Sequence, residues 1–122
     1  MNMMTQPEVK FIIEFPRGDS YQKGILLKRN GVPIEDTFDE VYFTVKKKHQ
    51  DYDVCFQKRM STGGIVSDGN GHYTIFIQPE DSNQLDFGDY DCDIELKRAD
   101  YKRTFYGKLK LTKEVTHYYN EG

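Results

Sequence analysis

Residues 89–97 alternate strictly between apolar and charged side chains, and this pattern constrains the fold more than any other feature of the sequence. Tyr90, Cys92, Ile94 and Leu96 share one parity, whereas the other parity is charged throughout. Successive side chains of a β-strand point to opposite faces of the sheet, so the segment predicts a strand with one buried and one solvated face. Further strands are predicted at residues 11–15, 23–28, 41–46, 52–58, 73–78 and 105–111.

The composition agrees with a chain built from strands. Ala99 is the only alanine, against nine Tyr and eight Phe, and alanine favours helices whereas aromatic and β-branched residues favour strands. Turn sequences such as Asn30-Gly31 and residues 68–71 separate the predicted strands, and one short helical turn is expected at residues 79–84. The sequence therefore predicts an all-β, antiparallel β-sandwich of about seven strands.

One domain accounts for the whole chain. A length of 122 residues lies near the commonest domain size. We predict a single domain over residues 1–122, with a core at about 9–116 and flexible arms at 1–8 and 117–122.

A local motif narrows the kind of sandwich. Asp86, Gly88, Tyr90 and Cys92 are spaced as in immunoglobulin domains at the entry to strand F, where the tyrosine hydroxyl bonds back to the backbone and forms a structural corner. The predicted second strand has no cysteine to pair with Cys92, and Cys55 is expected to face the opposite way from its neighbours. The prediction is an immunoglobulin-like sandwich with no disulfide.

Charge and hydropathy exclude several kinds of partner. The 17 Lys and Arg against 20 Asp and Glu give a net charge of −3, so no basic field would attract nucleic acid. Residues 46–48 form the only lysine run, which we interpret as a solvated strand edge. No segment approaches the roughly 18 apolar residues of a membrane span, and residues 1–10 lack the apolar stretch of a signal peptide. We expect a cytosolic chain with no nucleic-acid partner and no membrane insertion.

The residues that commonly hold metals are scattered. His49, His72 and His117 form no pair at metal-binding spacing, and the two cysteines are expected to be free thiols. The acidic row Asp89, Asp91 and Asp93 resembles the start of a calcium loop, but Ile94 stands where that loop needs glycine, and strand alternation already explains the row as a solvated face. No metal and no cofactor are predicted.

No catalytic motif is present. The tripeptide Arg17-Gly18-Asp19 matches the sequence that integrins bind, but after Pro16 it is interpreted as a polar turn. Carboxylates are plentiful, yet sequence alone pairs none of them at catalytic separation. We predict that the chain is not an enzyme and name no catalytic residue.

Exposed tyrosines are the remaining functional signal. Tyr42, Tyr106, Tyr118 and Tyr119 fall on predicted solvated faces or in the C-terminal arm. Tyrosine is enriched where protein surfaces meet, and aromatic rings also form platforms for sugars. Protein contact is favoured, since sugar platforms often use Trp and the chain has none.

The order of short motifs resembles a known family. These motifs are Arg17-Gly18-Asp19, residues 30–34, residues 41–46, residues 88–96, Gly107-Lys108-Leu109 and Glu114-Val115-Thr116. Together, over about residues 11–116, they resemble small immunoglobulin-like structural proteins, tail- or baseplate-associated, of tailed phages and prophages of Gram-positive bacteria. Their plan is similar to the N-terminal domain of upper baseplate proteins.

The resemblance implies a role and a location. It implies a non-catalytic tail or baseplate protein that contacts other phage structural proteins or a second copy of itself, with no cofactor. Such a chain would be in the bacterial cytoplasm during assembly and in the virion afterwards. The alternative that the residues leave open is a small carbohydrate-binding module for cell-surface glycans.

Overall fold

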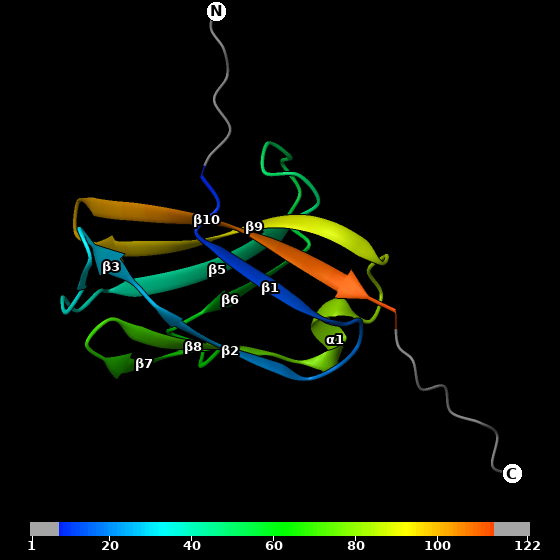
Figure 1. Ribbon diagram of the computed structural model, residues 1–122, viewed down its shortest axis with the longest axis horizontal. Helices are drawn as coiled ribbons and strands as arrows, with labels where there is room; N and C mark the ends of the chain where they lie inside the picture. The colour runs from blue at the N-terminus through cyan, green and yellow to red at the C-terminus, as the bar shows by residue number, and fades with distance from the viewer. Residues whose placement is uncertain (1–7, 114–122) are drawn as a thin grey trace, which may run out of the picture.

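The protein is a sandwich of two β-sheets (Figure 1). The computed structural model describes residues 8–113. The five-stranded sheet has the order β1 (Phe11–Pro16), β10 (Tyr101–Thr112), β9 (Gly88–Arg98), β5 (Glu40–Lys46) and β6 (Phe56–Arg59). The three-stranded sheet has the order β2 (Tyr21–Leu26), β8 (His72–Ile77) and β7 (Ile65–Gly69). A small ribbon joins β3 (Lys28–Arg29) to β4 (Val32–Pro33), and α1 (Pro79–Ser82) is a single helical turn.

The prediction of an all-β sandwich is confirmed, and both cysteines are free. The strand order is that of an immunoglobulin-like sandwich, except that the first strand has joined the sheet of the last two. This exchange makes one prediction wrong, because β1 pairs with β10 in parallel and the sandwich is not wholly antiparallel. The predicted arms lie outside the described residues, apart from Glu8.

Three strands were absent from the prediction. The ribbon strands β3 and β4 have two residues each and flank Asn30-Gly31, which the sequence indicated only as a turn. Strand β7 buries only Ile65 and exposes the rest, so it carries no alternation. The predicted strand at 52–58 is shorter than expected, since only its end belongs to β6.

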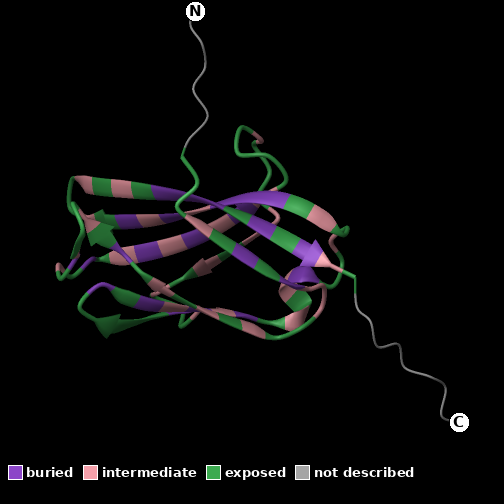
Figure 2. Ribbon diagram, viewed as in Figure 1, coloured by how far each residue is buried: buried purple, intermediate pink, exposed green. Residues whose placement is uncertain are grey.

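The core lies between the two sheets, and alternation determines which residues enter it. Strand β5 buries Val41, Phe43 and Val45 completely, and their neighbours face outward (Figure 2). Cys55 packs against the core and Val54 is 46% exposed, as their opposite parity predicts, but Phe56 also packs against the core, so the expected contrast between Cys55 and Phe56 is not seen. The core side chains come from both sheets, which is why the two layers fold as one unit.

The tyrosine of the predicted corner bonds to the backbone. Tyr90 is buried, and its hydroxyl donates a 2.7 Å hydrogen bond to the carbonyl oxygen of Asp86. Gly88, between them, has φ +121°, a conformation that side-chain-bearing residues rarely adopt. The bond ties the entry of β9 to the loop that precedes it.

The turn at Arg17-Gly18-Asp19 packs on α1. The Gly18 amide donates to the hydroxyl of Ser82, which is fully buried, at 2.8 Å. Arg17 donates to the carbonyl of Leu85 at 3.2 Å and lies over the Phe87 ring at 4.2 Å. The tripeptide is thus a structural turn that joins the two sheets.

Candidate functional site

The outward surface of the five-stranded sheet, called here the outer sheet face, gathers polar side chains from four strands. Strand register arranges these side chains in three cross-strand rows. The first row contains Arg59, Tyr42 and Glu95. The second contains Gln57, Thr44, Asp93 and Tyr106, and the third contains Lys46, Asp91 and Lys108. Because opposite residues on one sheet face lie within contact distance, these rows bring together groups far apart in the sequence.

Asp91 is the most heavily bonded residue of this face. Its Oδ1 atom accepts hydrogen bonds from the Tyr106 hydroxyl and the Lys108 ammonium, both at 2.7 Å, and Oδ2 accepts one from the His49 amide at 2.8 Å. Asp91 is only 8% exposed, so the prediction of a solvated acidic row is wrong at its centre. Residues 90–92 therefore form a continuous buried stretch that interrupts the alternation (Figure 2).

The electrostatics of Asp91 follow from these contacts. Burial on its own would raise the pKa of this carboxyl, but the hydrogen bonds from Lys108, Tyr106 and the His49 amide outweigh burial and lower the pKa to about 2. The same contact with Asp91 raises the pKa of Lys108. The pair is ionised at neutral pH and serves to hold β9, β10 and the loop of His49 together.

Tyr106 does not belong to a free contact surface, so the prediction for this residue is wrong. It is buried at 9% exposure, and the His49 ring packs edge-on against it with centroids 5.7 Å apart. Burial and the hydrogen bond to the Asp91 carboxylate raise the pKa of its hydroxyl. Sequence alternation placed Tyr106 on the outer face correctly, but a neighbouring loop covers that part of the face.

Tyr42 remains on the accessible part of the outer sheet face. It is half-buried, and the Arg59 guanidinium lies over its ring at 5.3 Å. Beside this pair is a shallow groove of about 370 Å³, bordered by Gln57, Asp93 and Glu95 among others. Tyr118 and Tyr119, the other two tyrosines predicted to make contacts, lie outside the described residues.

The groove is chemically polar and mainly acidic on its β9 side. Burial raises the pKa of Asp93, and the negative charge of Glu95 acts in the same direction. Lys46 opposes this shift from the neighbouring strand. The groove thus offers carboxylates, a guanidinium and an aromatic ring to an incoming surface.

The two cysteine thiols are poorly suited to act as nucleophiles or metal ligands. Burial raises the pKa of both Cys92 and Cys55, which keeps them protonated at neutral pH, and a protonated thiol is a weak nucleophile and metal ligand. Within residues 8–113, no cluster of three or more His, Cys, Asp or Glu side chains is arranged to hold a metal ion.

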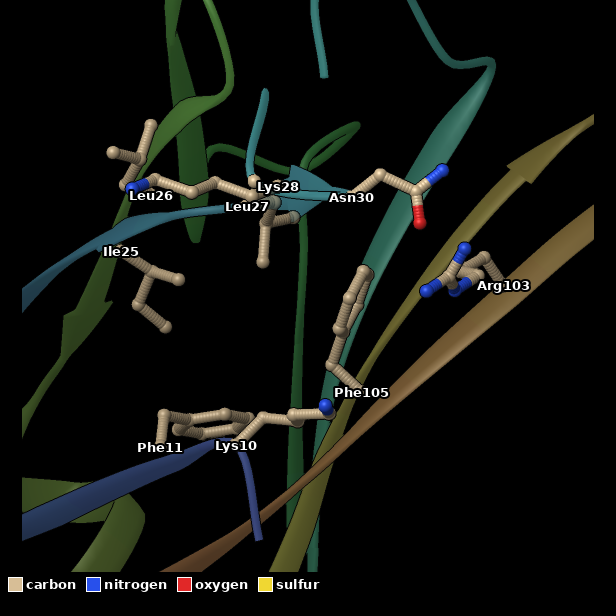
Figure 3. A pocket seen from close by; sticks show the side chains of 10 residues that line it. Lys10, Phe11, Ile25, Leu26, Leu27, Lys28, Asn30, Arg103 and Phe105 are labelled. Atoms are coloured by element: carbon tan, nitrogen blue, oxygen red, sulfur yellow. The ribbon is translucent and has the colours of Figure 1, made fainter. Parts of the chain in front are cut away.

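A second cavity lies where β1 and β2 separate, and no sequence pattern pointed to it. This seam pocket, of about 430 Å³, has apolar walls of Phe11, Ile25, Leu27 and Phe105 (Figure 3). Lys10, Lys28 and Arg103 also line it. In the sequence, each of these pocket residues occupies an ordinary strand or turn position. They form a pocket only because β1 and β2 diverge in three dimensions.

No protein-family model matches the chain, and no curated protein matches it significantly. Among the helices in residues 8–113, none has the length and apolar character needed to cross a membrane.

Proposed function

We propose that this chain is a non-catalytic protein-contact module of a phage or prophage tail or baseplate assembly, and that it docks on a partner through the outer sheet face. The phage setting is supported by the resemblance of its sequence motifs to small structural proteins of tailed phages. In this proposal the chain is in the bacterial cytoplasm during assembly and then in the virion.

The observation that carries the contact role is the pairing of Tyr42 with Arg59 on the open part of the outer sheet face. Tyrosine and arginine are the side chains enriched at the energetic centres of interfaces, because they combine a large apolar area with directed hydrogen bonding. The neighbouring groove supplies the acidic groups Asp93 and Glu95 for polar contacts around that centre.

Site-specific crosslinking tests the proposal directly. A photoreactive amino acid replaces Tyr42 in the full chain, and the matched control carries it at Val66, which is 41% exposed on the other sheet. The chain is co-expressed with the products of the genes adjacent to its own, and crosslinked products are analysed by mass spectrometry. We expect crosslinks from position 42 and few from position 66.

Native mass determination gives a second readout. We expect Tyr42→Ala to weaken co-assembly at least tenfold, about 1.4 kcal/mol, while Val66→Ser leaves it unchanged. The proposal would be overturned if the chain stayed monomeric and assembled with none of the co-expressed proteins. Glycan binding that disappears in Tyr42→Ala would instead assign the chain as a carbohydrate-binding module.

A further inference from the structure

The seam pocket exists because the edge strands of the two sheets meet at one end and part at the other. At the closed end the rings of Phe15 and Tyr21 stack, with centroids 4.9 Å apart and planes 10° apart. Toward the other end β1 and β2 diverge, and the pocket opens between Phe11 on one strand and Ile25 on the other (Figures 1 and 3). Its volume of about 430 Å³ lies in the range of about 300–1,000 Å³ that suits ligand binding.

The walls would accept an apolar group. Leu27 and Phe105 are buried at the base, and Phe11 and Ile25 are half-buried beside them. Figure 3 shows the side chains of Ile25, Phe11 and Phe105 around the open centre. An apolar side chain entering this space would remove its own surface and theirs from water.

The rim is basic in a chain whose net charge is negative. Lys28 and Arg103 form no ion pair within residues 8–113, and Lys10 forms one with the exposed Glu8 at 3.1 Å. Arg103 lies 5.0 Å from the Phe105 ring centroid, so its guanidinium stands directly beside the apolar wall. This charge arrangement is complementary to carboxylates that flank an apolar group.

The backbone next to the pocket is also free to pair. Strand β1 is hydrogen-bonded to β10 on one side and, among residues 8–113, has no strand partner on the other. Ile12 within β1 is 61% exposed, and Val9, just before the strand, is 41% exposed. Such an edge presents unpaired N–H and C=O groups that an extended chain can join as a further strand.

We propose that the seam pocket binds an extended, acidic segment of a partner protein. The segment pairs with the free edge of β1, inserts one apolar side chain between Phe11 and Phe105, and sets its carboxylates against Lys28 and Arg103. This proposal rests on the contact role proposed above, but it uses a different surface and defines the chemistry of a second partner.

A defined peptide tests the recognition chemistry. The probe is a fluorescein-labelled heptapeptide, Ser-Glu-Thr-Phe-Thr-Glu-Ser, whose alternating Glu and Phe side chains share one face of a strand. Fluorescence anisotropy with the full chain measures its affinity. We expect binding at least tenfold tighter than for the same peptide with Lys in place of Glu, or with Ser in place of Phe.

Variants of the chain locate the site. We expect the double change Lys28→Glu and Arg103→Glu to weaken probe binding at least tenfold. The matched control, Lys48→Glu with Lys110→Glu, alters the net charge equally at exposed positions and should bind as the wild type does. Arg103 is half-buried, so a change there can also affect folding. Lys28→Glu alone, at an exposed position, therefore serves as a second variant. Equal binding to all these chains would overturn the proposal.

Backbone pairing has its own test. Methylating alternate amide nitrogens of the probe should weaken binding strongly in one of the two alternating sets and little in the other, because only one set faces β1. If methylation of either set weakened binding equally, strand addition would be overturned. The same would follow if octanoate, which has no peptide backbone, bound as tightly as the probe. A chain that assembles through Tyr42 but prefers no acidic probe would refute this inference and leave the proposed function standing.

Discussion

The ring of Phe11 lies directly on Gly107, so close that a Cβ atom at Gly107 would be 2.5 Å from two ring carbons. The two residues are opposite each other in the parallel pairing of β1 with β10. The absence of a side chain at Gly107 therefore leaves the space that the Phe11 ring occupies, and this ring forms one wall of the seam pocket.

Gly107→Ala should destabilise the protein by about 1–3 kcal/mol, the usual cost of overpacking a filled site, because the Phe11 ring must move. Urea denaturation measures the change. Gly24→Ala is the matched control: a Cβ atom at Gly24 would have no other atom within 4 Å, and this change should alter stability by less than about 1 kcal/mol. Equal effects at both glycines would contradict the packing argument.

Tyr90→Phe should lower the free energy of unfolding by about 1 kcal/mol, because it removes the hydrogen bond to the Asp86 carbonyl and keeps the buried ring. Thermal or urea denaturation measures the loss. Tyr52 is 97% exposed, so Tyr52→Phe provides a control that should have no effect. An unchanged midpoint for Tyr90→Phe would mean that the corner contributes no net stability.

Ser82→Ala should cost about 1–3 kcal/mol, because it leaves the Gly18 amide without its acceptor in a closely packed turn. Chemical denaturation measures this loss, and Ser20→Ala at an exposed position is the control. If the two variants were equally stable, the contact between the turn and α1 would be dispensable.

Asp91 should give the protein a specific sensitivity to acid. Its pKa in the folded state, about 2, is below the ordinary value of 3.8. The group therefore contributes stability that is complete above about pH 4 and is lost as pH falls toward 2. The shift corresponds to about 2 kcal/mol at neutral pH.

Asp91→Asn should remove that part of the acid dependence. Stability measured from pH 7 to pH 2 should show the largest difference from the wild type at neutral pH and a shrinking difference toward pH 2. Asp89→Asn, at an exposed neighbouring position, is the control. Parallel pH profiles for wild type and Asp91→Asn would contradict the assignment.

The strands and the corner could be predicted from the sequence because their signals are local. Alternation identified the buried residues of β5, and a motif spanning seven positions indicated the bond from Tyr90 to Asp86. Asp91 and Tyr106 were placed on the correct sheet face, but their burial depends on the loop of His49, which is distant in the sequence.

The site was less predictable than the fold. Arg59 lies beside Tyr42 because of strand register between β5 and β6, which no single segment encodes. The seam pocket requires that β1 leave the sheet of β2, and the parallel pairing that causes this has no signature in the residues of β1 alone. Register and strand exchange are long-range properties, so local patterns do not reveal them.

The free, protonated thiols determine how the stability of this fold responds to redox conditions. Neither Cys55 nor Cys92 is joined in a disulfide, and burial keeps both in the unreactive form. The sandwich is held by its core and strand pairing, neither of which changes with redox potential. We therefore expect the free energy of unfolding to be the same with and without a reducing agent.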